Sequence, residues 1–303
     1  MDNGGGGYSP NLQFAECFNS PTKLCVCIFA FISGWAIALG KLTYRKSVGR
    51  IQKLMGSYWC IAIPAILLAV FVWDFELSGL GICKELLGLG ASVMIFAWYV
   101  PFYAVALIVM VFIQKWLDRD IKTALLVGVV LPMIVFTLMK KIPTSIEIQT
   151  LFNNLRHWFP CISVGYICNK NNCFDKIRSA LGNYNRFLIS GILIIFCFAG
   201  RYFISALDFC YCALLVFAIV NLQIHAKSCI GKFLYQCGKN SANMWFLHCL
   251  YFGEATRNLI QPLAYWAKSP ILIYAVAVIE LLCCSGVISW IKNRFGRGLG
   301  ITN

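Results

Sequence analysis

The sequence predicts an all-α protein, a polytopic bundle of transmembrane helices with about nine membrane-spanning segments. Hydrophobic residues make up 60% of the 303 residues and charged residues only 13%, whereas a soluble domain carries about 25% charged residues. Apolar runs of about 17 to 25 residues, long enough to cross a bilayer, recur along the chain. Despite the net charge of +14, basic residues are spread between these runs, so the expected partner is the lipid bilayer and not nucleic acid.

Each expected span is an apolar run bounded by polar residues. The fifth run is short, and its helix is expected to begin earlier, near Leu151. Residues 75–93 carry Lys84 and Glu85 inside an apolar stretch, which favours an interfacial or re-entrant segment. The nine spans, in one transmembrane domain over residues 24–291, are 24–40, 56–73, 94–114, 123–139, 157–168, 187–203, 204–222, 241–260 and 270–291.

The distribution of Lys and Arg predicts the topology, because cytoplasmic loops are enriched in both. Segments 41–55, 115–122, 169–186, 225–240 and 292–303 hold 18 of the 26 basic residues. We therefore expect a multi-pass protein of the inner (plasma) membrane with a cytoplasmic tail at 292–303. Nine spans then leave residues 1–23 as a polar extracytoplasmic segment. No signal-peptide pattern explains its export, which favours a further helix before Met1.

Cysteines and buried charges have simple structural interpretations. Most of the 16 cysteines lie inside apolar runs, where free cysteine behaves as a small packing residue. Cys168 and Cys173 lie near a polar loop, but no second cysteine pair or histidines accompany them, so no metal site is expected. Arg201 and Asp208 are expected to form an ion pair at the outer ends of neighbouring helices.

Segment 238–254 is the richest in polar groups among the expected spans. On a helix Ser241, Trp245, His248 and Phe252 recur at steps of four, three and four, so they share one stripe. A neutral histidine inside a span can accept a proton near pH 7. The alternative is a helix-capping Ser or Asn and a histidine bonded to a neighbouring helix.

Two further clusters suit a donor and an acceptor. Arg45, Arg50 and Lys53 fall at the expected cytoplasmic mouth of the first two spans. Basic groups there bind the phosphates of a cytosolic nucleotide, or they are an ordinary positive-inside loop. Trp98 and Tyr99 open the third span at the outer face, either as membrane-belt aromatics or as rings on which a sugar stacks.

Five segments, in this order, resemble motifs of the bacterial acyltransferase family 3, the membrane O-acyltransferases. They cover residues 24–260 and are Phe29–Trp35 (F-F-x-I-S-G-[FY]), Tyr44–Tyr58 (R-x-x-R-[IL] followed by an aromatic), Trp98–Tyr99 (W-[YF]-[LV]), Phe159–Gly165 (F-P-x-[FL]-x-x-G) and Gly238–His248 ([LG]-x-[NK]-S-x-x-[IM]-[WY]-x-x-H). Ser57 and Tyr58 stand where the family often has Pro-Tyr. The family usually has ten spans, and the chain begins after the first, which carries the histidine central to acyl transfer.

The resemblance implies an enzyme, an integral membrane O-acyltransferase. It would move an acetyl or other short acyl group from cytoplasmic acyl-CoA, with acetyl-CoA the expected co-substrate, to a hydroxyl of a cell-surface or lipid-linked glycan. No bound cofactor is implied. His248 would be the catalytic base, while Arg45, Arg50, Lys53 and Ser241 would bind the donor. The acceptor would lie against Trp98, Tyr99 and Trp245.

Two alternatives remain open. In the first, the chain is a catalytically impaired, truncated homologue that acts as a binding partner. Loss of the first helix would leave a groove in the bundle, which lipid or another chain must cover. In the second, the chain is a transporter of small solutes or lipid-linked sugars, since buried polar residues and proline-broken helices also mark substrate pathways.

Overall fold

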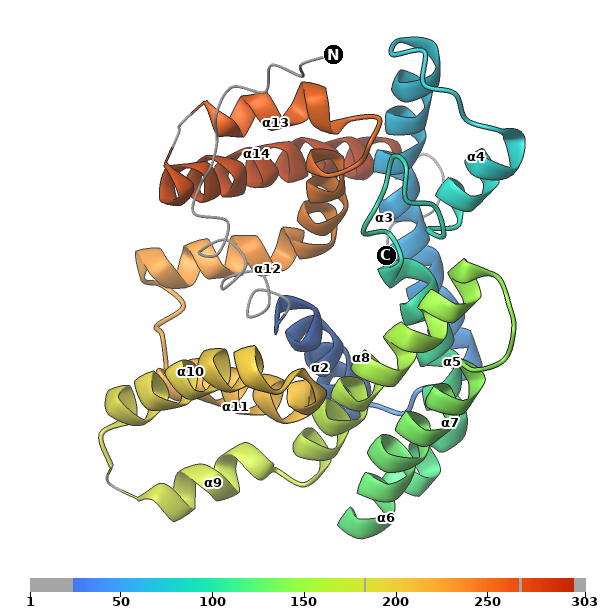
Figure 1. The fold of residues 1–303 in the computed structure, drawn as a ribbon. Helices are drawn as coiled ribbons and strands as arrows, with labels where there is room; N and C mark the ends of the chain where they lie inside the picture. Colours follow the sequence, from blue (N-terminus) through green and yellow to red (C-terminus); the bar gives the residue numbers. More distant parts are fainter. Residues whose placement is uncertain (1–23, 183, 267–268, 297–303) are drawn as a thin grey trace. The chain divides into compact units, whose positions relative to one another are not determined.

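The computed structural model describes residues 24–182, 184–266 and 269–296 (Figure 1). The described residues form helices joined by turns and loops, with no strand among them, which confirms the all-α prediction. The helices are α2 Leu24–Ala38, α3 Tyr44–Phe71, α4 Gly79–Leu86, α5 Tyr99–Leu117, α6 Ile121–Leu125, η1 Leu126–Val130, α7 Leu131–Met139, α8 Ile146–Lys170, α9 Cys173–Leu181, α10 Arg186–Phe203, η2 Ser205–Leu207, α11 Asp208–Asn221, α12 Cys229–His248, η3 Cys249–Tyr251, α13 Arg257–Tyr265 and α14 Pro270–Gly296.

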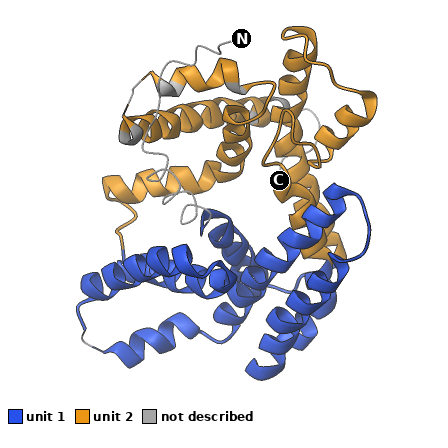
Figure 2. Cartoon of the chain, viewed as in Figure 1, with its two compact units in different colours: residues 1–43, 109–223 blue, residues 44–108, 224–303 orange. Residues whose placement is uncertain are grey.

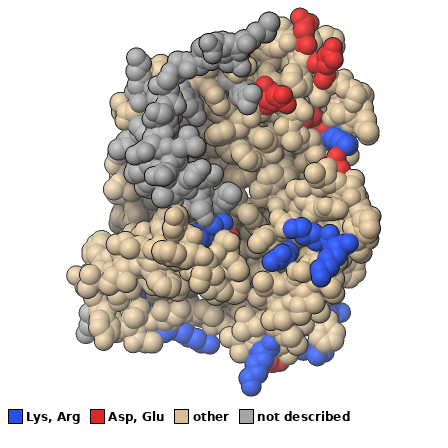
Figure 3. Space-filling view, in the orientation of Figure 1, with Lys and Arg blue, Asp and Glu red and all other residues tan. Residues whose placement is uncertain are grey.

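Within the described residues, five helices are long and apolar enough to cross a membrane. They are Tyr44–Phe71, Tyr99–Leu117, Ile121–Met139, Arg186–Phe203 and Leu272–Lys292. Each overlaps an expected span, and the shorter apolar helices Leu24–Ala38 and Ser205–Asn221 overlap two more. Most of the surface visible in Figure 3 is uncharged. The chain is therefore a helical membrane protein in outline, whereas nine spans are not confirmed.

Two expected loops and one expected span are wrong. Segments 44–55 and 229–240 are the first turns of α3 and α12, not loops. Helix α12 starts early because the Ser228 hydroxyl accepts the N–H of Gly231 at 3.0 Å, which caps the helix. Helix α8, the fifth expected span, also begins earlier than predicted, at Ile146.

The expected span 241–260 is broken after His248. The main-chain N–H of Ala255 donates to the carbonyl of Ser92 at 3.1 Å, and the hydroxyl of Thr256 donates to the carbonyl of Leu250 at 2.6 Å. Gly253 lies so close to the carbonyl of Val93 that a Cβ there would overlap it. Contacts with a segment some 160 residues earlier thus replace the next helical turn.

The chain forms two compact units (Figure 2). Unit 1 comprises residues 1–43 and 109–223, and unit 2 comprises residues 44–108 and 224–303, so the boundary falls inside α5. The expected N-terminal segment 1–23 lies outside the described residues, as does 297–303 of the expected tail. The described residues 292–296 of that tail belong to α14.

Unit 1 is built on a close crossing of α2 and α8. A Cβ on Gly34 would overlap the carbonyl of Ile162, and one on Gly165 would overlap the carbonyl of Phe31. Small residues of this kind let two helix backbones touch in a membrane. Cys27 and Cys161 are fully buried beside this crossing, as expected of packing cysteines.

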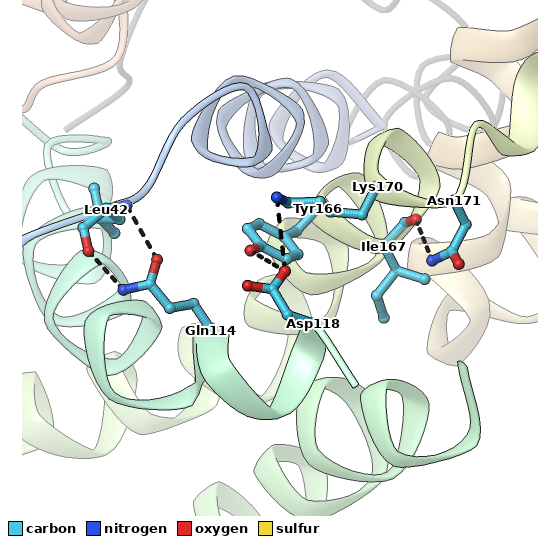
Figure 4. A network of polar contacts seen from close by, with 7 residues as sticks. All are labelled: Leu42, Gln114, Asp118, Tyr166, Ile167, Lys170 and Asn171. Atoms are coloured by element: carbon cyan, nitrogen blue, oxygen red, sulfur yellow. Dashed lines mark hydrogen bonds and ion pairs between the residues drawn. The ribbon is translucent and has the colours of Figure 1, made fainter. Parts of the chain in front are cut away.

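Polar side chains tie helix α5 of unit 1 to the segment after α2 and to α8 (Figure 4). The Gln114 side chain bonds both main-chain groups of Leu42, at 2.5 and 3.0 Å. Asp118 accepts the hydroxyl of Tyr166 at 2.7 Å and lies 3.8 Å from the Lys170 ammonium. Helices α10 and α11 lie side by side (Figure 1). The predicted ion pair joins them, with Arg201 Nε 2.6 Å from an Asp208 oxygen.

Candidate functional site

Unit 2 brings together the residues that the sequence analysis assigned to catalysis and to the acceptor. The ring of His248 stacks on Phe96, with centroids 5.1 Å apart and an interplanar angle of 7°. Trp245 lies 4.8 Å from the His248 ring and contacts Trp98 and Tyr99 at 6.5 and 6.0 Å between ring centroids. We define the His248 cluster as Phe96, Trp98, Tyr99, Trp245, His248 and Phe252. Of the predicted stripe, Trp245 and His248 lie on α12, whereas Phe252 lies beyond the end of that helix, with its ring 6.1 Å from that of His248.

The hydrogen bond of His248 determines which ring nitrogen is a base. Nδ1 of His248 is bonded to the carbonyl oxygen of Trp245. Because a carbonyl oxygen only accepts, Nδ1 carries the hydrogen of the neutral ring and Nε2 holds the lone pair. The ring is half-buried. His248 therefore presents a proton-accepting nitrogen among aromatic rings.

Glu85, which the sequence analysis left without a role, positions the segment that carries Phe96. Glu85 is only 1% exposed. The carboxylate accepts the main-chain N–H groups of Ser92, Val93 and Met94 at 2.7, 3.1 and 3.0 Å. The hydroxyl of Tyr58 on α3 donates to the main-chain carbonyl of Glu85. A carboxylate with three N–H partners fixes the course of the backbone between α4 and α5.

The same segment is attached directly to α12. The indole Nε1 of Trp245 donates to the main-chain carbonyl of Phe96 at 3.2 Å. Together with the ring stack of Phe96 on His248, this bond holds both sides of the cluster in register. Phe96 and Glu85 both lie in apolar stretches of the sequence. A carboxylate is unusual in such a stretch, so Glu85 carries a signal, whereas Phe96 carries none.

A polar seam runs between α3, α12 and α14, also in unit 2. Asn243 donates to the hydroxyl of Ser289 at 3.1 Å, and this hydroxyl donates to Asn240 at 3.1 Å. Lys292 donates to the hydroxyl of Ser57 at 2.6 Å, and this hydroxyl donates to the main-chain carbonyl of Lys53 at 3.1 Å. The polar seam consists of Lys53, Ser57, Asn240, Asn243, Ser289 and Lys292. Asn243 lies about 7.5 Å below His248 along α12, since a helix rises 1.5 Å per residue.

The predicted donor residues separate into two groups. Lys53 contacts the polar seam through its main-chain carbonyl, which accepts the hydroxyl of Ser57 at 3.1 Å. The residue itself is exposed, as is Arg45, and Arg50 is half-exposed in the first turns of α3. Neither arginine has a side-chain partner among the described residues. Ser241 is half-buried in the middle of α12, so the helix-cap interpretation is wrong. Its neighbours Asn240 and Asn243 make the bonds to α14, which residue type alone did not reveal.

No protein-family model, no curated protein and no solved structure matches the chain. The resemblance of five segments to acyltransferase family 3 therefore stays a prediction. The function has to be argued from the His248 cluster and the polar seam themselves.

Proposed function

We propose that this protein is an integral membrane O-acyltransferase that moves a short acyl group from acyl-CoA to a hydroxyl of a glycan. One observation carries the proposal: the Trp245 carbonyl holds Nδ1–H of His248, and this leaves Nε2 as a base inside a cluster of aromatic rings. An acceptor hydroxyl gives its proton to Nε2 as its oxygen attacks the thioester carbonyl. The new C–O bond forms as the C–S bond breaks, and the departing thiolate takes the proton to give free CoA.

The rings of the His248 cluster support a sugar acceptor. Trp98, Tyr99 and Trp245 are all half-buried, so each combines a fixed position with an accessible part of its ring. Aromatic side chains offer large, rigid apolar faces with a polar N–H or O–H at the edge. The apolar C–H face of a pyranose and its hydroxyls match both features. The cluster would thus orient a hydroxyl toward Nε2 of His248.

The polar seam supports acyl-CoA as the donor. The main chain of Lys53 and the ammonium of Lys292 both contact the Ser57 hydroxyl, so a phosphate bound here would meet two basic residues. Arg45 and Arg50 lie on the same helix as Lys53, toward its N-terminus, where guanidinium groups suit the remaining phosphates. The amide nitrogen of Asn243 bonds Ser289, and the amide oxygen of Asn243 would accept an N–H of the pantetheine arm. The thioester would then reach toward His248. The basic ends of α3 and α14 would lie at the cytoplasmic face of the inner membrane.

Release of free CoA tests the proposed reaction. The protein in lipid nanodiscs is given acetyl-CoA and a panel of glycan acceptors, and the thiol of free CoA is measured. We expect acceptor-dependent release, which His248→Gln lowers by about 10²- to 10⁴-fold, the usual contribution of a general base. The matched control is His225→Gln, because His225 is exposed in the turn before α12. Absence of release by the unmodified protein with every acceptor would contradict the proposal.

Donor binding is tested separately. We expect Lys53→Gln to weaken acetyl-CoA binding by about tenfold, the loss expected for one charge-assisted contact. Lys232→Gln removes an equal charge from the exposed first turn of α12 and serves as the control. Equal affinity in both variants would remove the polar seam from the donor site.

A further inference from the structure

A cavity of about 200 Å³ opens in unit 1, at one end of the α10 and α11 pair. It is outside the His248 cluster and the polar seam, both of which belong to unit 2. The residues that matter for its chemistry are Arg178, Tyr184, Arg186, Ile189, Asn221 and Gln223. Helix α9 supplies Arg178, the start of α10 supplies Arg186 and Ile189, and the end of α11 supplies Asn221. No acidic side chain lines the cavity within the described part of the chain.

Among the described residues, the contacts of the two arginines leave most of their donors for a ligand. One nitrogen of Arg186 donates to the amide oxygen of Gln223 at 2.5 Å, which is a neutral partner. Arg178 pairs with Asp175 at 3.1 Å, but the side chain of Asp175 is 76% exposed, and such surface pairs hold weakly. A guanidinium has five N–H donors, arranged to match the oxygens of a phosphate. The cavity therefore has the charge and the donors of a phosphate site.

Position and surroundings favour a phosphate that is attached to lipid. Residues 169–186 are an expected cytoplasmic segment, and α10 is one of the helices long enough to cross a membrane. Ile189 lines the cavity, and Ile192 and Phe196 follow it on the same face of α10 at steps of three and four. Ile192 and Phe196 are 56% and 54% exposed. An apolar strip thus leads from the basic cavity along the outside of a spanning helix.

We propose that this cavity binds the phosphate head group of an anionic phospholipid, whose acyl chain lies along Ile189, Ile192 and Phe196. Basic pockets between transmembrane helices on the cytoplasmic side are suited to anionic head groups. Arg186 and Arg178 grip the phosphate, while Tyr184, Asn221 and Gln223 bond the polar substituent of the head group. A zwitterionic lipid brings a cation into a cavity that already holds two, so it binds less well.

Native mass spectrometry of the full chain, with phosphatidylglycerol or phosphatidylcholine added in equal amounts, tests the site. We expect phosphatidylglycerol to be retained preferentially, and Arg186→Gln to lower its retention roughly five- to tenfold. The control Lys176→Gln removes an equal charge from an exposed position on α9 that does not line the cavity. Equal loss in both variants, or equal retention of the two lipids, would overturn the proposal.

A second variant keeps the test decisive if Arg186→Gln does not fold. Ile189→Phe leaves both arginines in place but fills part of the cavity, and we expect it to reduce phosphatidylglycerol retention as well. Glycerol phosphate separates the two sources of the phosphate group. It should compete only weakly, because it lacks the acyl chain. If it binds as tightly as phosphatidylglycerol, the cavity is a site for a soluble phosphate and the lipid assignment is wrong.

Discussion

Two buried carboxylates, Asp208 in unit 1 and Glu85 in unit 2, are stabilised in different ways. Asp208 is 3% exposed and lies 2.6 Å from the guanidinium of Arg201, on the neighbouring helix. Glu85 is 1% exposed and accepts three main-chain N–H groups. The first arrangement involves the side chain of Arg201, and the second depends on the conformation of a whole segment. A charge of the first kind can be removed together with its partner, whereas the partners of Glu85 are present in every variant.

The largest effect is expected for Arg201→Met, which removes the cation that balances Asp208. Loss of one member of a buried pair costs about 3–5 kcal/mol of unfolding free energy. The double variant Arg201→Met with Asp208→Leu should recover most of this loss, because no charge then remains buried. Unfolding in mixed detergent micelles measures both. A double variant as unstable as the single one would mean that the pair is not the main interaction of Asp208.

Glu85→Gln should lower the unfolding free energy less, by about 1.5–3 kcal/mol, since an amide oxygen replaces a charge-assisted acceptor. No second substitution should restore it, because the donors are main-chain groups of Ser92 to Met94. Glu76→Gln changes an exposed carboxylate nearby and is the control. If acyl transfer is confirmed, Glu85→Gln should also slow it, while a variant destabilised equally in unit 1 should not.

Tyr58→Phe examines the anchoring of Glu85 without altering its carboxylate. The hydroxyl of Tyr58 donates to the main-chain carbonyl of Glu85. Its removal should lower the unfolding free energy by about 0.5–1.5 kcal/mol, the value of one neutral hydrogen bond. A loss as large as that of Glu85→Gln would show that the hydroxyl, and not the carboxylate, holds the segment.

The smallest effect is expected at Asp120, an exposed carboxylate that also accepts main-chain N–H groups. The hydroxyl of Thr123, followed by the N–H groups of Thr123 and Lys122, lowers the pKa of Asp120. Its contribution to stability is therefore present above the unfolded pKa of about 3.9 and is lost as the pH falls through the folded pKa. Thr123→Val should raise that pKa, which a titration of unfolding below pH 5 detects. An unchanged acid limb would contradict this account.

The difference between the two buried carboxylates also explains which contacts could be predicted from the sequence. Arg201 and Asp208 were predicted to pair because both are charged and lie in adjacent apolar runs. Glu85 was recognised as unusual, but its partners are amides common to every residue, so no letter in the sequence identifies them. The all-α class and five spanning helices followed from hydropathy. The end of α12 did not, because Ala255 bonds to Ser92, far away in the chain.

The candidate site divides in the same way. Trp98, Tyr99, Trp245 and His248 were selected by chemistry, and they do lie together. Phe96 was missed because an aromatic residue in an apolar run carries no distinguishing signal. Lys292 was assigned to the tail, since the last turns of α14 resemble a basic terminus, whereas its ammonium bonds Ser57, 235 positions earlier. Contacts of this kind depend on tertiary packing and not on local pattern.

The close crossing of α2 and α8 bears on the order in which these two helices are synthesised and packed. Gly34 meets Ile162, so about 130 residues must be synthesised before α2 can acquire its partner. At roughly 5–20 residues per second, that interval is on the order of 10 s. During it α2 leaves the ribosome without the helix that packs against Gly34. We therefore expect α2 to be held by the insertion machinery, or to enter the bilayer late and together with α8.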